Sequence, residues 1–408
     1  MKYLKTIIIA AFVLTPFIVE RYAVKTYSAA ENFADHGNFS PRNQSEIRNP
    51  KSEIAYRWNL PPGFPVPIVP ADNPMSDAKV ELGRHLFYDK RLSLNEKTSC
   101  GTCHLQERAF TEDKKTSVGT FGAVHPRNSM TLTNVAYNAA FNWANPAVVL
   151  PERHAMLPIF GESPIVEMGM TGKEALLVER LKAEPRYAGL FADAYPDDAD
   201  PLTLNHVMQS IACFVRSLIS GNSPYDRYRQ QKKSDAISES AKRGEKLFFS
   251  ERMECFDCHA GFNLSGTVNF TGKALENAQY ENNGIYNIDG RGAFPPDNTG
   301  LFEVTHKPED MGRFKVPTLR NVELTAPYMH DGSIATLDEV IEHYKAGGRT
   351  IREGPFAGVG SKSPLKSDFV RGFYLTAQEK QDLVEFLKSL TDRDFTTDPK
   401  FSNPWETK

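Results

Sequence analysis

Two short motifs contain four of the chain's five cysteines: Cys100-Gly-Thr-Cys103-His104 and Cys255-Phe-Asp-Cys258-His259. In C-x-x-C-H the two thiols can add across the vinyl groups of a haem, and the adjacent imidazole can then bind the iron as an axial ligand. A zinc site or a thiol redox motif also uses paired cysteines, but neither requires a histidine directly after the second one. The motifs therefore predict two covalently bound c-type haems, with His104 and His259 as iron ligands.

The composition indicates a folded chain with room for two domains. The sequence has 408 residues, of which 40% are hydrophobic and 24% are charged, and its net charge is −3. A single domain typically has about 100–200 residues, so two domains are expected. The chain lacks the basic stripes that bind phosphate backbones, and no nucleic-acid partner is therefore expected.

The N-terminus has the pattern of a secretory signal. Lys2 and Lys5 precede an apolar run over residues 6–19, and Ser28-Ala-Ala30 supplies small residues for cleavage. These features predict a signal peptide over residues 1–30 and export to a periplasm. An uncleaved segment would attach the protein to a membrane, but the run is shorter than the roughly 17–25 residues that a spanning helix needs.

An internal repeat organises the rest of the chain. Gly83-Arg-His-Leu-Phe-Tyr88 resembles Gly244-Glu-Lys-Leu-Phe-Phe249, and a C-x-x-C-H motif follows each segment. The repeat predicts two related cytochrome c-like haem domains. The predicted division of the chain is a polar linker or arm (31–60), an N-terminal haem domain with the peroxide site (61–232), a C-terminal haem domain (233–395) and a tail (396–408).

Helical periodicity is the main local signal in both halves. It predicts helices over residues 76–88, with Asp77 as the cap, and over residues 203–220. Capping boxes at Thr336-Leu-Asp-Glu339 and Thr376-Ala-Gln-Glu379 predict two more helices. The segments between are rich in Gly, Pro and Asn and show no strand periodicity. The predicted fold class is mostly α, with long ordered loops.

Several further segments resemble those of the bacterial dihaem cytochrome c peroxidase superfamily. They are Pro126-Arg-Asn128, Asn134-Val-Ala-Tyr-Asn-Ala139, Glu167-Met-Gly-Met170, Lys315-Val-Pro-Thr-Leu-Arg-Asn321 and Thr325-Ala-Pro-Tyr-Met-His-Asp-Gly-Ser333. The similarity runs from about Pro61 to Asp392. Within the superfamily the sequence most resembles the MauG and MbnH branch, whose members oxidise residues of a partner protein.

The resemblance implies that Tyr344 is the second axial ligand of the C-terminal haem, where peroxidases of the superfamily supply a methionine. A phenolate favours ferric and higher iron states, whereas a thioether favours ferrous iron. Tyr344 also lies on the predicted buried face of its helix, so its position alone does not distinguish ligation from packing. Met329 and Met311 are alternative ligands, and His343 is expected on a different side of the helix.

The resemblance also implies a peroxide pocket at the N-terminal haem. His154, Pro158 and Glu167 correspond to the residues of that pocket, and Glu167 is the expected general acid and base. For His154 a structural role is an equal alternative. Thr120 replaces the histidine that blocks this haem in many of the peroxidases, which implies a permanently open site, although His125 in the same loop could bind instead.

Two more features are implied by the resemblance. Trp143 corresponds to a tryptophan between the two haems that could relay electrons, although an ordinary core position is the alternative. Asn128, with the backbone carbonyls of Thr325 and Pro327, corresponds to a calcium site, and oxygen ligands suit that ion.

The sequence as a whole predicts a periplasmic dihaem oxidoreductase of the MauG and MbnH type. It would react with hydrogen peroxide and use high-valent haem iron to oxidise a Trp or Tyr of a partner protein, such as a copper-binding protein. One alternative is a dihaem peroxidase that takes electrons from a small cytochrome c or cupredoxin. Another is a non-catalytic dihaem electron carrier.

Overall fold

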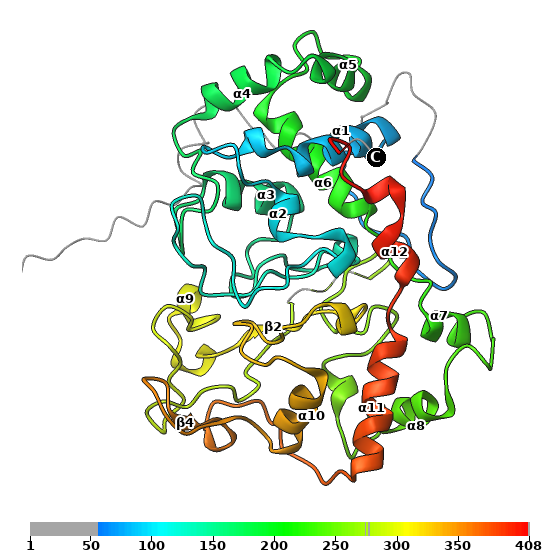
Figure 1. Cartoon of the computed structure of the whole chain (residues 1–408), viewed down its shortest axis with the longest axis vertical. Helices are drawn as coiled ribbons and strands as arrows, with labels where there is room; N and C mark the ends of the chain where they lie inside the picture. Colours follow the sequence, from blue (N-terminus) through cyan, green and yellow to red (C-terminus); the bar gives the residue numbers. More distant parts are fainter. Residues whose placement is uncertain (1–55, 274, 276–277, 407–408) are drawn as a thin grey trace, which may run out of the picture. The chain divides into compact units, whose positions relative to one another are not determined.

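Helices joined by long loops dominate the computed structural model, which describes residues 56–273, 275 and 278–406 (Figure 1). The helices are α1 (Asp77–Tyr88), α2 (Cys100–Cys103), α3 (Pro151–Phe160), α4 (Glu174–Lys182), α5 (Pro185–Ala194), α6 (Leu204–Ser217), α7 (Pro224–Arg229), α8 (Glu239–Phe248), α9 (Phe302–Thr305), α10 (Leu337–Lys345), α11 (Ala377–Ser389) and α12 (Arg393–Thr397). In the same described part, β1 (Tyr280–Glu281) pairs with β2 (Phe314–Lys315) and β3 (Thr350–Ile351) with β4 (Gly358–Val359), both antiparallel. The prediction of a mostly helical fold is confirmed.

The predicted signal peptide and most of the predicted arm lie outside the described residues. Ile54–Lys408 forms a single compact unit, so the boundary between residues 232 and 233 stays a prediction. Among residues 56–273, 275 and 278–406 there is no helix with the length and hydropathy needed to span a bilayer.

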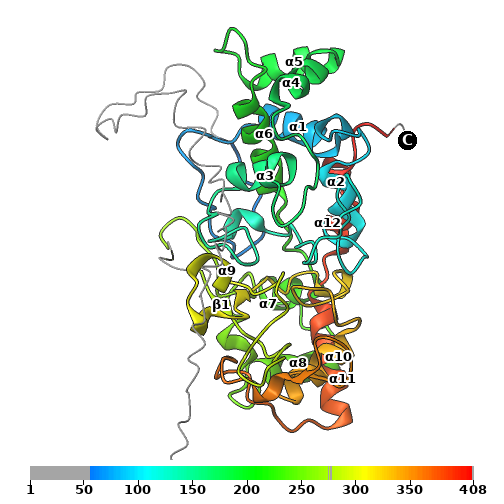
Figure 2. The same cartoon turned by 90° about the vertical axis from the view of Figure 1, so that its left-hand side faces the viewer.

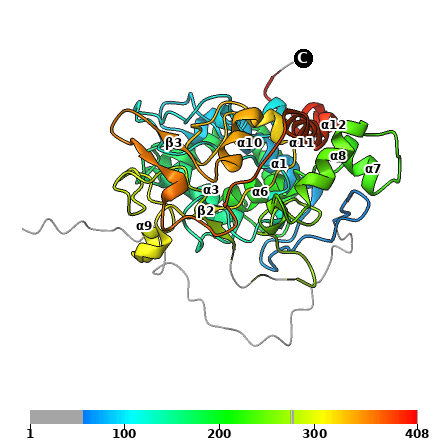
Figure 3. The ribbon, with the colours of Figure 1, turned by 90° about the horizontal axis from the view of Figure 1, so that it is seen from below.

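Two helix pairs are built in the same way. Helix α1 packs against α6, and α8 packs against α11, beside which it lies in Figure 3. A Cβ added to Gly83 would collide with a backbone carbonyl of α6 and lie 2.9 Å from Cβ of Phe214. A Cβ added to Gly244 would collide with a backbone carbonyl of α11 and lie 2.8 Å from Cβ of Phe386. The two glycines of the sequence repeat therefore allow the same close helix approach.

The equivalence extends to two asparagines in left-handed backbone conformations. Asn134 has a φ of 57° and Asn321 a φ of 60°. The N–H of Asn134 donates to the carbonyl of Leu218, just after α6, at 2.9 Å, and the N–H of Asn321 donates to the carbonyl of Leu390, just after α11, at 3.1 Å. Oδ1 of Asn134 also accepts from the N–H of Ser220, and Oδ1 of Asn321 from the N–H of Asp392, at 2.7 Å in both cases. The loop after each haem motif is thus fixed to the end of one long helix by the same contacts.

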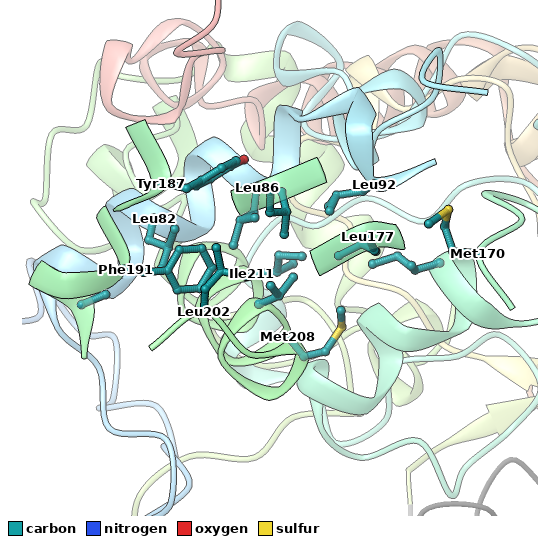
Figure 4. Close-up of a cluster of buried hydrophobic side chains, with 14 of the residues drawn as sticks. Leu82, Leu86, Leu92, Met170, Leu177, Tyr187, Phe191, Leu202, Met208 and Ile211 are labelled. Carbon is teal, nitrogen blue, oxygen red and sulfur yellow. The ribbon is translucent and has the colours of Figure 1, made fainter. Parts of the chain in front are cut away.

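The first helix pair belongs to an apolar core shown in Figure 4. Leu82 and Leu86 from α1 pack with Phe191 from α5 and with Met208 and Ile211 from α6. All five side chains are buried. Because burial of each such side chain contributes about 1.5–3 kcal/mol, this core provides a stable base for the loops that carry the first motif.

The helix starts agree with the sequence patterns except at one cap. Ser76, not Asp77, caps α1, because the Ser76 hydroxyl accepts from the N–H of Lys79 at 3.1 Å. Asp77 is instead the first helical residue, where its charge interacts favourably with the helix dipole. The predicted capping boxes at Thr336 and Thr376 are both present and open α10 and α11.

The last segment of the chain returns to the first helices. In Figures 1 and 2, α12 lies near the blue and cyan elements. The Tyr88 hydroxyl donates to the carbonyl of Phe401 at 2.7 Å, and the indole of Trp405 donates to a carbonyl of α1 at 2.9 Å. The rings of Phe395 and Phe401 pack against Phe110, with centroids 5.6 and 6.3 Å away. Much of the segment predicted as a tail is therefore part of the folded core.

Candidate active site

The first motif folds into a single helical turn. The backbone N–H of Ser99 donates to the Thr102 hydroxyl at 2.9 Å, which fixes the start of α2. Cys100 and Cys103 are three residues apart on this turn and therefore lie on neighbouring positions of the helix surface. All five cysteines of the chain are free in the structure, so the four motif thiols are available for thioether bonds.

Both motif histidines are oriented by a backbone carbonyl. Nδ1 of His104 donates to the carbonyl of Phe110 at 2.8 Å, and Nδ1 of His259 donates to the carbonyl of Leu264 at 3.2 Å. Phe110 and Leu264 have left-handed φ angles of 60° and 47°, a conformation that costs of order 1–3 kcal/mol in non-glycine residues. With Nδ1 engaged, Nε2 of each ring is left as the nitrogen that can bind a metal. The sequence offers no signal for this arrangement, because neither accepting residue is Gly, Asn or Asp.

A cavity of about 270 Å³ lies beside the second motif. Its wall includes Cys255, Cys258 and His259 of the second motif and Tyr344 of α10. Burial raises the pKa of Tyr344 to about 12, and a hydrogen bond from Asn283 acts in the opposite direction. Two thiols, an oriented imidazole and a phenol that face one apolar-walled cavity are a donor set that fits a covalently attached haem.

The alternative ligands have different positions. Met329 lines the same cavity, and its sulfur accepts from Nδ2 of Asn283 at 3.3 Å. Met311 is not part of the cavity wall; its carbonyl accepts from Nδ2 of Asn282 at 2.9 Å. His343 also lies outside the wall, as expected, with Nε2 3.0 Å from the carbonyl oxygen of Asn283. Of the predicted ligand and its alternatives, Tyr344 and Met329 line this cavity, and Met311 and His343 do not.

Helix α3 and the following loop bring the predicted peroxide-pocket residues together. His154 and Pro158 are four residues apart on α3 and share a face. The N–H of Met168 donates to the carbonyl of Pro158 at 2.9 Å, which places Glu167 beside the end of this helix. Burial lowers the pKa of His154 to about 4, and the charge of nearby His104 acts in the same direction. His154 is therefore neutral at physiological pH.

Glu167 is in an environment that favours its protonated form. Burial raises the pKa of this carboxyl to about 7, and the negative charge of Glu112 adds to the effect. Nε2 of His125 lies 3.9 Å from Oε1 of Glu167. The hydroxyl and the N–H of Thr120 donate to the carbonyl of Glu167 at 2.7 and 2.8 Å. The loop that carries Thr120 and His125 thus contacts both the side chain and the backbone carbonyl of Glu167.

Glu112 and Lys315 were not among the predicted site residues. Glu112 is buried and accepts from the Ser129 hydroxyl at 2.7 Å. Lys315 is buried in β2 and lines the cavity of the second motif, and burial lowers its pKa to about 8. Glu112 lies eight residues after His104. A single acidic residue in a loop does not by itself indicate a functional site. Lys315 lies within a segment that carried the resemblance, which did not indicate a role for it.

Trp143 lines the same cavity as the second motif. Its indole N–H donates to the carbonyl of Asn128 at 2.8 Å, and its own carbonyl accepts from the N–H of Lys315 at 2.9 Å. Nδ2 of Asn128 donates to two carbonyls, of Lys114 and Lys115, at 3.1 Å each. This leaves Oδ1 of Asn128 as the atom that could bind a cation.

Thr325 and Pro327 line the cavity together with Asn128. The three predicted calcium ligands are therefore brought to one region of the molecule. Their ligating atoms are an amide oxygen and two carbonyl oxygens, without a carboxylate, which is compatible with a hard cation that keeps several waters.

Two attachment motifs, each with an oriented histidine, define a dihaem protein of the cytochrome c type. A sequence model of the di-haem cytochrome c peroxidase family matches residues 77–234. The methylamine utilization protein MauG of Methylorubrum extorquens is 35% identical over 79% of this chain and 80% of its own length. The cytochrome-c peroxidase IdrP1 of Denitromonas iodatirespirans is 34% identical over 85% of this chain and 90% of its own length.

A solved structure of a MauG-like protein associated with microbial copper homeostasis is 46% identical to this chain. The two superpose with a TM-score of 0.83 over 86% of this chain and 100% of the other. The chain belongs to the di-haem cytochrome c peroxidase family, with two c-type haems, and is a peroxide-dependent oxidoreductase. Relatives of similar identity include both MauG proteins and peroxidases, so the choice between these activities depends on the site itself.

Proposed function

We propose that this protein is an exported MauG-like enzyme that uses hydrogen peroxide to oxidise a Trp or Tyr side chain of a partner protein. The observation that carries the proposal is Tyr344, which lines the cavity of the second motif together with His259. When bound, the two haems supply the redox chemistry by which peroxide accepts two electrons. A phenolate ligand at the second haem favours storage of oxidising equivalents over acceptance of electrons at high potential.

In the proposed reaction Glu167 acts as the general base and general acid. With a pKa near 7, its carboxyl can take a proton from one peroxide oxygen and return it to the departing oxygen. His154, neutral and on the same side of the pocket, orients the peroxide by a hydrogen bond. Pro158 adds a rigid apolar wall that limits water.

Trp143 is the proposed electron relay. It lines the cavity of the second motif, and its indole N–H is held by the carbonyl of Asn128, which belongs to the segment after the first motif. This hydrogen bond fixes the orientation of the indole. Removal of Trp143 is expected to leave the reaction with peroxide intact while slowing oxidation of the partner.

The same proposal includes two haem domains, residues 61–232 and 233–395, and a calcium ion bound by Asn128, Thr325 and Pro327. The repeated packing of Gly83 and Gly244 supports the division into related domains. The similarity to a structure associated with copper homeostasis supports a copper-binding protein as the partner. The predicted signal peptide supports a periplasmic location.

A conventional peroxidase is the second candidate, because Met329 lines the same cavity as Tyr344. In that case a thioether would bind the second haem, and a small cytochrome c or cupredoxin would supply electrons. Met ligation raises the reduction potential, which suits acceptance of electrons from such a donor.

Electron paramagnetic resonance of the ferric protein separates the two candidates. We expect one high-spin and one low-spin haem, with Tyr344→Phe changing only the low-spin signal and Met329→Leu changing neither. Peroxide added without a reductant should remove both wild-type signals together. A low-spin signal that changes in Met329→Leu but not in Tyr344→Phe, in a protein inactive until half-reduced, contradicts the proposal and identifies a conventional peroxidase.

A further inference from the structure

Two buried nitrogen groups in the cavity of the second motif have no partner from the chain. Lys315 and His330 both line this cavity, and only 4% and 3% of their surfaces are exposed. Nε2 of His330 is buried without a hydrogen-bond partner among the described residues. The ammonium of Lys315 makes no hydrogen bond or ion pair with any residue that the structure describes. Because buried polar groups are almost always paired, both groups indicate an acceptor that the chain does not supply.

A series of contacts holds the two residues close together. The N–H of Lys315 donates to the carbonyl of Trp143 at 2.9 Å, and the indole of Trp143 donates to the carbonyl of Asn128 at 2.8 Å. The N–H of Asn128 donates in turn to the carbonyl of His330 at 2.8 Å. The imidazole of His330 stacks on the ring of Phe314, the residue before Lys315, with centroids 3.6 Å apart. Lys315 and His330 therefore belong to one fixed region of the cavity wall.

The acidic residues of the cavity wall do not neutralise Lys315. Oε2 of Glu254 lies 3.6 Å from Nε of Arg371, and Oε1 of Glu281 accepts from Nε2 of Gln279 at 3.2 Å. Burial lowers the pKa of Lys315 to about 8, and no carboxylate of the described residues offsets this effect. An anion placed in the cavity would stabilise the buried ammonium by a charge-assisted hydrogen bond.

We propose that Lys315 and His330 bind a propionate carboxylate of the haem attached at the second motif. The ammonium of Lys315 supplies the positive charge, and the imidazole of His330 donates one hydrogen bond through Nε2. The two residues thereby orient the haem without binding its iron. The inference goes beyond the proposed function, because it holds whether Tyr344 or Met329 is the iron ligand.

The test compares Lys315→Met with Lys315→Arg in the full dihaem protein. Loss of a positive charge beside the haem disfavours ferrous iron, which carries one positive charge fewer than ferric iron. We expect Lys315→Met to lower the reduction potential of the second haem and to shift the propionate bending band of its resonance Raman spectrum. Lys315→Arg, which keeps the charge and the donors, should retain the wild-type values of both. A redox titration followed by the low-spin electron paramagnetic resonance signal measures the potential.

A second pair of variants tests the imidazole. His330→Phe keeps a ring for the stack on Phe314 but has no donor, so it should change the potential and the Raman band in the same directions as Lys315→Met, by smaller amounts. His330→Gln, which restores an N–H donor, should return both toward the wild-type values. If Lys315→Met does not accumulate, the two His330 variants decide the question.

Lys79→Met is the matched control. Lys79 is also buried, but it lies outside the cavity wall, and its Nζ donates to Oδ1 of Asn73 at 3.3 Å and to the carbonyl of Pro74 at 3.2 Å. This variant should lose stability without any change in the potential or the Raman band of the second haem. A wild-type potential and Raman band in both Lys315→Met and His330→Phe overturn the proposal. A potential of the wild-type protein that depends on added acetate also overturns it, because a free anion would then occupy the site.

Discussion

Glu167 combines partial burial with a neighbouring carboxylate, and both raise the pKa of its side chain to about 7. The groups that face it are Glu112 and His125. An acid that is half ionised near neutral pH can both accept and donate a proton within one turnover. The residue is therefore the point at which pH should control the reaction with peroxide.

The rate of the reaction with peroxide should rise with pH through about 7 and then level off, because the carboxylate form of Glu167 takes the first proton. Glu167→Gln should lower this rate by roughly 10²–10⁴ and remove the rise. Stopped-flow absorbance of the Soret band at a series of pH values measures both effects. Glu162→Gln, at an exposed position in the same loop, is the control and should behave as the wild type.

The sequence predicts which residues bind the haems, but it does not predict which residues orient them. The motif cysteines and histidines could be recognised because their spacing is fixed by covalent chemistry. The carbonyls of Phe110 and Leu264 could not, since their roles depend on the left-handed backbone angles of these two residues. Groups that hydrogen-bond a metal-binding side chain do not occur at a fixed distance from it in the sequence.

At the scale of elements, the internal repeat was the most informative part of the sequence. Its glycines lie where two helices approach too closely for a side chain. The capping boxes at Thr336 and Thr376 predict where α10 and α11 begin, and both helices begin there. At α1 two adjacent residues, Ser76 and Asp77, are both good caps, and only the backbone angles of the folded chain decide that Ser76 is the cap.

Gly244→Ala should destabilise the protein by about 1–3 kcal/mol, because the new methyl group must displace a backbone carbonyl of α11. Gly83→Ala should have a similar effect on α1 and α6. Gly189→Ala in α5 is the matched control, since a Cβ there meets open space and Ala favours helix over Gly by up to about 1 kcal/mol. Urea unfolding monitored by circular dichroism measures the three variants. Equal stability of the Gly244 and Gly189 variants would contradict the close-packing argument.

At the scale of the whole molecule, the two halves meet in a buried hydrogen-bond network. Nδ2 of Asn321 donates to the hydroxyl of Ser220 at 3.1 Å, and Asp392 accepts from the N–H groups of Gly221 and Asn222 at 3.0 and 2.9 Å. These contacts join segments about 100 and 170 residues apart in the chain. Such pairing of distant segments could not be predicted from local sequence patterns.

Phe401→Ala should destabilise the protein by about 3–5 kcal/mol, because the ring is buried against Phe395 and Phe110. The carbonyl of Phe110 orients His104, so the resonance of the first haem should broaden while that of the second stays unchanged. Unfolding and electron paramagnetic resonance of the same sample test both parts. An equal change at the two haems would show that the effect is general and not transmitted through Phe110.

The return of α12 and the following residues to Phe110 has a consequence for attachment of the first haem. The rings of Phe395 and Phe401 pack against Phe110, whose carbonyl orients His104. A chain whose C-terminal segment has not yet folded lacks these two rings. We therefore expect the first motif to be more accessible for haem attachment before the end of the chain has packed than after it.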